Sequence, residues 1–324
     1  MRKGLRIMLI LVGLIVVLFA AANLYIRGQA VDFFHNTIEE QKERIRDEYE
    51  EGTLEDTLRP VQVIRYEESG LNLKEVTVVN DSGMSLNGYY APSKNGAAVR
   101  LLHGATAFPY HMLQEAMMLD RHGFGVALIT VRNHNFSDGD TLSFGCDDRE
   151  MEDIRAWHQF LNQQEGIDPE KVGLLGQSMG GTLVIQYAAQ SEGIKAVVAV
   201  SAPSSLEYAM PTFITYDTGL PLPIARLTAG LFLFWADREI SCDLSTVNAS
   251  EWIYDISPRA VYILHGEEDP QLPAESGELL YEAAGEPKYY WLCEGSGHHE
   301  CDTDHPQEFE ERIVGFFDEY LLAD

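Results

Sequence analysis

From residue 74 onward, short apolar segments alternate with longer amphipathic ones, and this alternation limits the possible folds more than any other feature of the chain. Apolar or alternating runs of five or six residues predict strands, and segments of 11 to 18 residues between most of them predict helices. Strands that alternate with helices favour a mostly parallel sheet with helices on both faces, here an α/β fold of eight strands. The predicted strands are Glu75–Val79, Leu86–Ala91, Ala97–Leu102, Val126–Val131, Lys171–Leu175, Ala196–Val200, Ala260–Leu264 and Lys288–Leu292.

The alternation is interrupted once. Five prolines and an apolar run fall between Pro203 and Pro258, where neither a strand nor a helix of the regular pattern is evident. We expect residues 203–258 to be an insertion that covers the sheet as a lid. The helices predicted elsewhere in this part of the chain cover residues 111–122, 147–164, 180–190, 274–284 and 306–322.

The N-terminus has a different character. Ile7–Ile26 is a stretch of 20 residues without a charged side chain, and as a helix it would span roughly 30 Å, the thickness of the hydrocarbon core of a bilayer. Arg2, Lys3 and Arg6 precede it, whereas acidic residues dominate after it. The positive-inside rule therefore predicts a cytoplasmic N-terminus and a catalytic domain outside the cytoplasm.

The alternative for this stretch is a cleaved signal peptide, because Ala20-Ala21-Ala22 offers small residues for cleavage and the product would be secreted. The apolar stretch continues past these alanines, which favours an uncleaved anchor. We expect residues 1–27 to be a transmembrane anchor, residues 28–60 a polar helical stalk or linker, and residues 61–324 the folded domain.

The charge balance excludes several classes of partner. The chain has 51 acidic and 23 basic residues, a net charge of −28, and such a surface repels nucleic-acid phosphates. Neither G-x-G-x-x-G nor G-x-x-x-x-G-K-[ST] occurs, so no nucleotide cofactor is indicated. We expect neither a cofactor nor a nucleic-acid partner.

One motif points to nucleophilic chemistry. Gly176-Gln177-Ser178-Met179-Gly180 is a G-x-S-x-G match that follows a predicted strand and precedes a predicted helix. In that strand–turn–helix setting the glycines permit a sharp turn, which holds the hydroxyl of Ser178 above the sheet as a nucleophile. The alternative is a serine that only caps the helix.

A serine hydroxyl needs a base, and the base needs an orienting acid. His298 follows the last predicted strand in a glycine-rich loop, and its neighbour His299 is a rival that spacing alone does not exclude. Asp269 follows the preceding strand and so belongs to the same edge of the sheet. The rivals of Asp269 are Glu267 and Glu268.

The oxyanion of an acyl intermediate needs backbone donors. The amide of Met179, directly after the serine, and that of Ala105, in the loop after the third strand, are the candidates. We expect four residues to contact the substrate, namely His103, Tyr208, Phe213 and Trp235, although the aromatic residues of the insertion could equally form the core of the lid. The aromatic residues are Tyr208, Phe213, Tyr216, Phe232, Phe234 and Trp235.

The histidine loop could also hold a metal ion or be flanked by a disulfide. The segment from His298 to His305 has enough ligand types for a metal, but its spacing matches no familiar zinc pattern, so no metal is expected. The four cysteines form no C-x-x-C pair. Cys293 and Cys301 flank the histidine loop and either form a disulfide there or remain free thiols.

Four segments occur together in an order that resembles the α/β-hydrolase superfamily, in particular bacterial membrane-anchored hydrolases of the dienelactone-hydrolase-like and prolyl-oligopeptidase-like group. They are His103-Gly104-Ala105, the motif around Ser178, His265-Gly266-Glu267-Glu268-Asp269 and Gly295-Ser296-Gly297-His298. The resemblance implies a triad of Ser178, Asp269 and His298 in the order nucleophile, acid, base. It departs at Arg132-Asn133-His134-Asn135, where these enzymes often have Arg-Gly-His-Gly, and after Ala105, where a glycine usually recurs.

The sequence therefore predicts a serine hydrolase that cleaves a carboxylic ester or thioester of a small-molecule acyl substrate through an acyl-enzyme. A peptidase of the same fold is the alternative within the class. A binding module that keeps the fold without catalysis is the alternative outside it, and a complete triad argues against that module.

Overall fold

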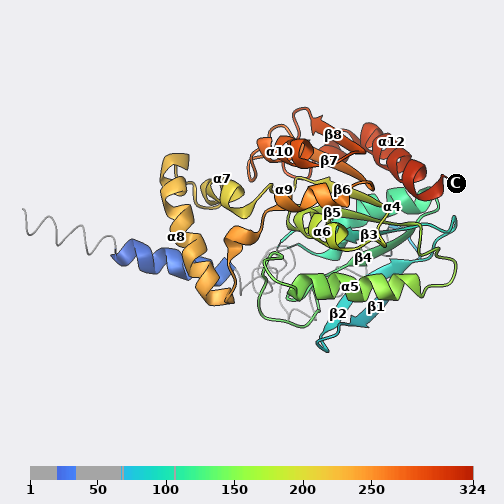
Figure 1. Cartoon of the computed structure of the whole chain (residues 1–324), viewed down its shortest axis with the longest axis horizontal. Helices are drawn as coiled ribbons and strands as arrows, with labels where there is room; N and C mark the ends of the chain where they lie inside the picture. The colour runs from blue at the N-terminus through green and yellow to red at the C-terminus, as the bar shows by residue number, and fades with distance from the viewer. Residues whose placement is uncertain (1–19, 34–66, 68, 106, 324) are drawn as a thin grey trace, which may run out of the picture.

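The computed structural model describes residues 20–33, 67, 69–105 and 107–323. Its centre is an eight-stranded sheet in the order β1-β2-β4-β3-β5-β6-β7-β8 (Figure 1). The pairs β1–β2 and β2–β4 are antiparallel, and all other neighbours are parallel. The strands are β1 (Lys74–Val79), β2 (Ser85–Ala91), β3 (Ala98–Leu102), β4 (Gly125–Ile129), β5 (Val172–Gln177), β6 (Ala196–Val200), β7 (Ala260–Gly266) and β8 (Lys288–Cys293). The mostly parallel sheet of eight strands predicted from the alternation is confirmed, with bounds that differ by one or two residues.

Helices cover both faces of the sheet, so the central parallel strands are buried on both sides and appear in the sequence as continuous apolar runs. Successive residues of β3, such as Leu101 and Leu102, enter opposite cores. One core is covered by α4 (Leu113–Arg121) and α12 (Pro306–Phe317). The other is covered by α5 (Arg149–Asn162), α6 (Met179–Gln190) and α10 (Glu275–Ala283). Short elements complete this part of the fold: η1 (Pro109–Met112), α11 (Cys301–Asp304) and η4 (Asp318–Leu322).

The segment that departs from the Arg-Gly-His-Gly pattern keeps the backbone that the glycines would provide. Asn133 and Asn135 have φ values of 58° and 56°. Asparagine is among the few residues other than glycine that adopt this left-handed region readily. Arg132 fixes the segment with a pair of hydrogen bonds from its guanidinium to the buried carboxylate of Asp153, at 2.7 and 2.9 Å. The substitution of asparagine for glycine is therefore compatible with the same local turn.

The insertion predicted over residues 203–258 divides into two parts. The long helices α7 (Leu206–Thr218) and α8 (Leu222–Ile240) extend away from the sheet at one end of the molecule (Figure 1). Of the remaining elements, α9 (Ala249–Trp252) and η3 (Ile253–Ile256) pack beside α6 in the core, whereas η2 (Leu244–Thr246) contacts α7 and α8. Only α7 and α8 are therefore placed to act as a lid.

Residues 20–33 form a helix, called here the N-terminal helix, that packs against α8 (Figure 1). Trp235 Nε1 donates a hydrogen bond of 3.0 Å to Asn23 Oδ1, and the Arg27 guanidinium lies 5.1 Å from the centre of the same indole. Further along the helix, the Phe33 ring lies 5.3 Å from that of Phe213. The N-terminal helix is thus held against the lid.

Most of the predicted transmembrane stretch, and most of the predicted stalk over residues 28–60, lies outside the described residues. Within the part that the structure describes, a membrane-span criterion of length and hydropathy is met by no single helix. It is met only by α7 and α8 taken together, and these two helices are bent by 115° relative to each other. The transmembrane anchor stays a prediction.

All four cysteines lie in disulfides. Cys293 and Cys301 are bonded, with Cα atoms 5.7 Å apart, so the bridge considered from the sequence is present beside the histidine loop. The second bridge joins Cys146 to Cys242, with Cα atoms 6.2 Å apart. It links the segment before α5 to the C-terminal end of α8, and its two partners are too distant in the chain for spacing to pair them.

Candidate active site

Ser178 lies between β5 and α6 in a strained backbone conformation. Its φ and ψ are 52° and −119°, values that side chains other than glycine rarely adopt. Its N–H donates to Val200 O at 2.8 Å, and its own carbonyl accepts from Thr182 N at 3.1 Å, so β6 and the first turn of α6 both hold it. This is the geometry of a nucleophile elbow.

The glycines of the motif allow this turn because other backbone lies where their side chains would be. A Cβ on Gly176 would collide with the carbonyl of Gly180, and a Cβ on Gly180 would collide with the carbonyl of Leu102 at the end of β3. Gly104 in the next loop is also close, since a Cβ there would lie 3.2 Å from Ser178 Cβ. The motif therefore brings β5, α6 and the loop after β3 into direct contact around the serine.

Asp269 and His298 meet at the same edge of the sheet, after β7 and β8. His298 Nδ1 lies 2.6 Å from Asp269 Oδ2, a hydrogen-bond distance. The other oxygen of Asp269 accepts the backbone N–H groups of Gln271 and Leu272, each at 2.9 Å. Because Nδ1 of His298 is hydrogen-bonded to the carboxylate, Nε2 is the ring nitrogen that can accept a proton.

The environment keeps Asp269 ionised. Burial on its own would raise the pKa of this carboxyl, but hydrogen bonds with His265 and His298 outweigh burial and hold its pKa well below the usual value. His265 Nε2 lies 3.3 Å from Asp269 Oδ2. A carboxylate that is buried, ionised and bonded to Nδ1 can orient an imidazole and stabilise its protonated form.

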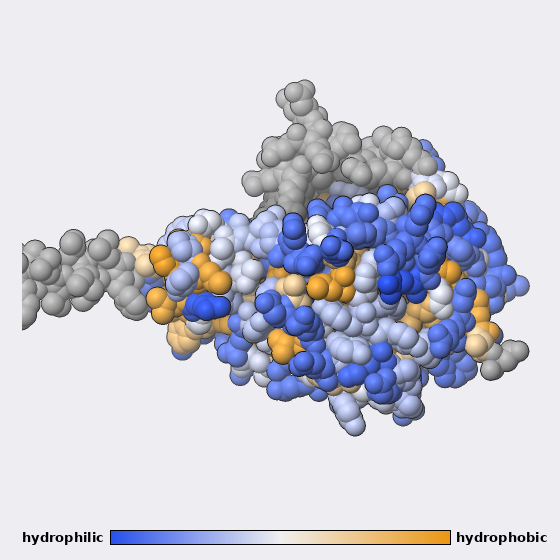
Figure 2. All heavy atoms as spheres, turned by 90° about the horizontal axis from the view of Figure 1, so that it is seen from above, coloured by the Kyte–Doolittle hydropathy of each residue, from blue (hydrophilic) through white to orange (hydrophobic). Residues whose placement is uncertain are grey.

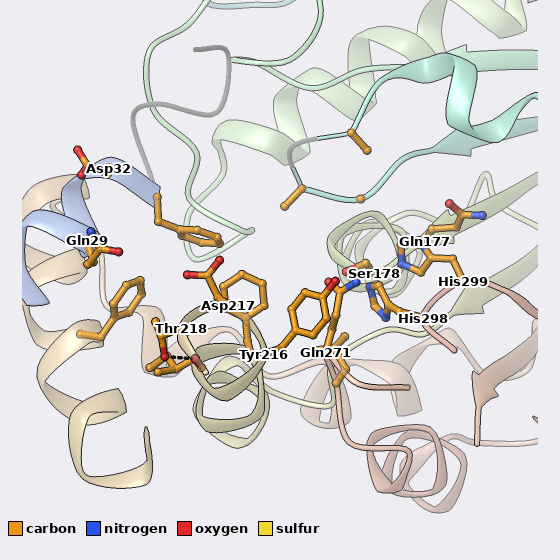
Figure 3. Close-up of a pocket in the computed structure, with 18 of the residues that line it drawn as sticks. Gln29, Asp32, Gln177, Ser178, Tyr216, Asp217, Thr218, Gln271, His298 and His299 are labelled. Atoms are coloured by element: carbon orange, nitrogen blue, oxygen red, sulfur yellow. Dashed lines mark hydrogen bonds between the residues drawn. The ribbon is translucent and has the colours of Figure 1, made fainter. Parts of the chain in front are cut away.

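The rival residues are placed differently. His299 is half-buried on the wall of the cavity described below, and desolvation first and the charge of His298 second hold its pKa well below the usual value, so this ring is neutral. Glu267 accepts the backbone N–H of Gly295 at 3.0 Å, and Glu268 is exposed. The geometry pairs Asp269 with His298 rather than with its neighbour, and Figure 3 shows Ser178 beside both histidines.

One candidate oxyanion donor, Met179, directly follows Ser178, and the other, Ala105, follows Gly104, which lies close to Ser178. Met179 is the first residue of α6 and is buried, and Ala105 lies on the wall of the cavity described below. The N-terminus of α6 adds the positive end of a helix dipole at the same point. The positions of both residues are compatible with donation to an oxyanion, and this role stays a prediction.

A cavity of about 1070 Å³ opens from Ser178 toward the lid. This volume is at the upper limit of what ligand sites usually have. Figure 3 shows it extending from Ser178 and His298 at one end to Gln29 and Asp32 of the N-terminal helix at the other. Its apolar walls include Ala22, Tyr25, Ile26, Phe33, Phe213, Ile214, Leu220, Phe232 and Leu272.

Only one of the four predicted substrate contacts lies on this cavity, namely Phe213. His103 is buried behind the loop, with its ring centre 4.9 Å from that of His134. Tyr208 is 44% exposed on the outside of α7, and Trp235 packs against the N-terminal helix. The expectation of substrate contact is therefore wrong for His103, Tyr208 and Trp235, because burial in the core or the orientation of the helix turns them away from the cavity.

Sequence reasoning missed the contribution of the N-terminal helix. We expected residues 20–26 to lie in an anchor, yet Ala22, Tyr25 and Ile26 form part of the wall of the cavity. Gln271 and Thr303, from the loops after β7 and β8, also line it. No signal in the sequence pairs the N-terminal helix with the lid, because their contact is set by tertiary packing.

In the described part of the chain, one group of His, Cys, Asp and Glu atoms is close enough to hold a metal ion, and it consists of Cys146, Asp147 and Cys242. Both of its sulfur atoms are already joined in a disulfide. Within the segment His298–His305, His298 bonds to Asp269 and His305 Nε2 lies 2.8 Å from Glu294 O. The possible ligand atoms of this segment therefore do not meet at one metal site.

A buried carboxyl lies directly behind the nucleophile. Gln177 Nε2 donates to Glu115 Oε1 at 2.5 Å, and Glu115 is fully buried. Burial first, and the nearby Asp302 carboxyl second, raise the pKa of Glu115 to about 8. At neutral pH Glu115 is therefore largely protonated in the folded chain. The residue before Ser178 is held by a neutral acid rather than by a carboxylate.

This pKa predicts how Glu115→Gln should respond to pH. A carboxyl whose pKa is raised on folding stabilises the protein fully below its unfolded pKa of 4.5, and this contribution is lost as pH rises toward 8. The isosteric amide has no such loss, so the stability of the variant relative to wild type should increase by on the order of 4 kcal/mol from pH 5 to pH 8. Melting temperatures of both proteins across this range test the prediction. A difference that stays constant with pH would contradict it.

With the geometry established, the chain can be compared with known proteins. The family model for the alpha/beta hydrolase fold matches residues 98–228, which include β3 to the start of α8 and Ser178. The protein described as uncharacterized YfhR of Escherichia coli (strain K12) is 26% identical over 243 residues, 72% of this chain and 76% of its own length. Thiohydrolase aneE of Aspergillus aculeatus is 30% identical over 128 residues, 39% of this chain and 40% of its own.

Solved structures agree on the architecture. An esterase of Pyrococcus furiosus superposes with a TM-score of 0.67 at 20% identity, covering 79% of this chain and 94% of that one. An alpha/beta hydrolase called GrgF from a Penicillium species superposes with a TM-score of 0.63 at 18% identity, covering 78% and 100%. At this level of identity the likeness concerns the fold. Together with the family match over residues 98–228 and the elbow around Ser178, it shows that this chain has the alpha/beta hydrolase fold and supports its resemblance to that superfamily.

Proposed function

We propose that this protein is a serine hydrolase that cleaves a carboxylic ester or thioester through an acyl-enzyme. One observation carries the proposal: Ser178 stands in a strained elbow at the end of a large cavity, and His298, whose Nδ1 lies 2.6 Å from Asp269, lines the same cavity. Strain of this kind is concentrated at functional sites. A binding module has no use for a strained serine beside an oriented imidazole.

The chemistry follows from these positions. Ser178 Oγ attacks the carbonyl carbon while its proton passes to His298 Nε2, and the resulting oxyanion is held by the amides of Ala105 and Met179. When the tetrahedral intermediate collapses, the leaving alcohol or thiol takes the proton from His298. A water molecule, deprotonated by His298, then attacks the acyl group and releases the acid and the free serine. Asp269 stays ionised throughout and stabilises the imidazolium.

The choice of an ester or thioester over a peptide rests on the walls of the cavity. Phe213, Ile214 and Phe232 line the cavity that opens from Ser178 and suit an uncharged acyl group. The names of the compared proteins also favour an ester or thioester, since they include an esterase and a thiohydrolase. Cleavage of peptides by the same residues is the alternative within the class.

A panel of substrates tests the proposal. We expect the purified full-length protein to label with a fluorophosphonate and to hydrolyse p-nitrophenyl esters and acyl thioesters with kcat/KM at least about 100-fold above that for matched peptide anilides. The apolar residues on the walls of the cavity give the reason, because they offer contacts for an uncharged acyl chain. Faster cleavage of the anilides would favour the peptidase. Absence of labelling together with absence of turnover would favour a binding module.

A further inference from the structure

The outward face of α8 is apolar, which is unusual for a surface helix. Ile224, Leu227, Leu231 and Phe234 follow one another at spacings of three, four and three residues and so lie on one face. Leu227 is 82% exposed. The opposite face of α8 packs into the core, so the helix is apolar on two sides. A helix with this distribution is suited to an apolar neighbour on both sides.

This surface continues onto the two adjacent helices. Of the large hydrophobic residues exposed in the described part of the chain, three are scattered elsewhere, namely Val79, Tyr254 and Leu279. All the others lie on the N-terminal helix, α7 or α8, and Figure 2 shows hydrophobic residues gathered at that end of the molecule. We call them the apolar patch: Leu24, Tyr25, Tyr208, Tyr216, Ile224, Leu227 and Phe234.

The charges along most of α8 differ from those of the rest of the chain, whereas on α7 Glu207 and Asp217 adjoin the patch residues Tyr208 and Tyr216. Acidic residues outnumber basic ones by 51 to 23 overall, yet residues 218–236 contain no acidic side chain and only one charge, that of Arg226. Arg27 and Arg238 lie close by, on the N-terminal helix and at the end of α8, and Arg238 stacks on the Phe234 ring at 3.9 Å. Long cationic side chains beside apolar surface can reach lipid headgroups, which acidic residues would not do.

The course of the chain indicates what covers the patch. Residues 7–19 are apolar without exception apart from one glycine, they carry no charge, and they run directly into the N-terminal helix that carries Leu24 and Tyr25. If Ile7–Ile26 is the membrane anchor that the sequence predicts, Leu24 and Tyr25 lie near its outer end, and the N-terminal helix that carries them lies at the membrane surface. The patch, which packs around that helix, then faces the bilayer.

The cavity connects this surface to the nucleophile. Tyr25 and Tyr216 are exposed members of the patch, and both also line the cavity that ends at Ser178. We infer that the apolar patch docks in the interface of the lipid bilayer, and that the substrate is a long-chain acyl ester which enters the cavity from the bilayer between the N-terminal helix and the lid. The docking rests on the patch and on the predicted anchor, whereas the choice of substrate rests on the proposed hydrolase function.

Spin labels on the full-length protein in phosphatidylcholine nanodiscs test the docking without any measurement of activity. The four native cysteines are paired, so Leu227→Cys supplies a single labelling site on the patch. Val79→Cys, at another exposed hydrophobic position, is the matched control. The label at position 227 should collide more often with oxygen, which concentrates in lipid, than with a water-soluble nickel chelate. The label at position 79 should show the opposite ratio.

Two results would overturn the docking. One is equal access of the nickel chelate to positions 227 and 79. The other is strong spin–spin coupling between labels at position 227, since this would mean that a second copy of the chain covers the patch. Neither depends on whether the protein is a hydrolase.

The substrate is tested with Ile224→Gln/Leu227→Gln, two residues of the patch that do not line the cavity. This variant should lose about tenfold or more of its kcat/KM toward a long-chain ester held in the nanodisc, while hydrolysis of a water-soluble acetate ester stays unchanged. The control Val79→Gln should leave both rates unchanged. Equal losses on both esters, or no loss on either, would refute entry from the bilayer. Failure of the wild-type protein to cleave the acetate ester would refute the hydrolase function itself.

Discussion

Replacing Ser178 with alanine should abolish labelling by a fluorophosphonate and reduce ester hydrolysis by a factor on the order of 10⁵, because the nucleophile and its base act as one unit. The fold should be unaffected. Alanine removes a single oxygen, and the hydrogen bonds that hold this turn use the backbone of Ser178 rather than its side chain. Labelling, steady-state kinetics and a melting curve on the same preparation measure all three effects.

Ser201 provides a matched control for that variant. It follows β6, the strand beside β5, and it also has a positive φ, of 45°. Its hydroxyl, however, is buried and lies 3.4 Å from the backbone nitrogen of His299, from which it can accept a hydrogen bond. Ser201→Ala should still label with the probe. If Ser178→Ala labels at the wild-type rate, or if Ser201→Ala loses labelling instead, the nucleophile is not Ser178.

The second large effect concerns the base and its acid. His298→Ala should lower kcat/KM by a factor on the order of 10⁵, and Asp269→Asn by about 10⁴, because the amide no longer stabilises the imidazolium or fixes its tautomer. This prediction rests on the 2.6 Å distance between His298 Nδ1 and Asp269 Oδ2. Steady-state rates on a soluble ester at pH 7.5 test both variants.

His299→Ala is the control for these two variants. It removes an adjacent imidazole that is neutral and has no contact with Asp269 of the kind His298 makes. Its loss should stay below about 100-fold and come from local repacking. A larger loss for His299→Ala than for His298→Ala would transfer the role of base to the neighbouring residue.

The central fold was predictable because burial on both faces leaves a simple trace in the sequence. The strands β5 and β6 appear as apolar runs, and the glycines of the elbow have a steric reason that holds in any chain with this turn. The pairing of His298 with Asp269 was one of several possibilities in the sequence. It became definite only when the loops after β7 and β8 were placed.

The packing of the lid was harder to predict, because burial on several sides of a helix removes the single apolar stripe that would identify its inner face. A helix such as α8, apolar on most sides, has no stripe that reveals which face enters the core. Trp235 therefore gave no sign that it would contact Asn23, more than 200 residues away in the chain. The bridge between Cys146 and Cys242 is equally nonlocal. Contacts of this kind depend on tertiary packing and leave no local pattern.

The Cys146–Cys242 bridge and the Cys293–Cys301 bridge contribute unequally to stability, so reduction of each should have a different effect. Cys146–Cys242 spans 96 residues and encloses both Ser178 and the lid, whereas Cys293–Cys301 spans eight residues beside His298. Loop-closure entropy gives about 4.7 kcal/mol for the long loop and about 2.5 kcal/mol for the short one. A chain made in a reducing compartment would thus lose more stability through the long bridge than through the short one, and α8 would no longer be tied covalently to the segment before α5.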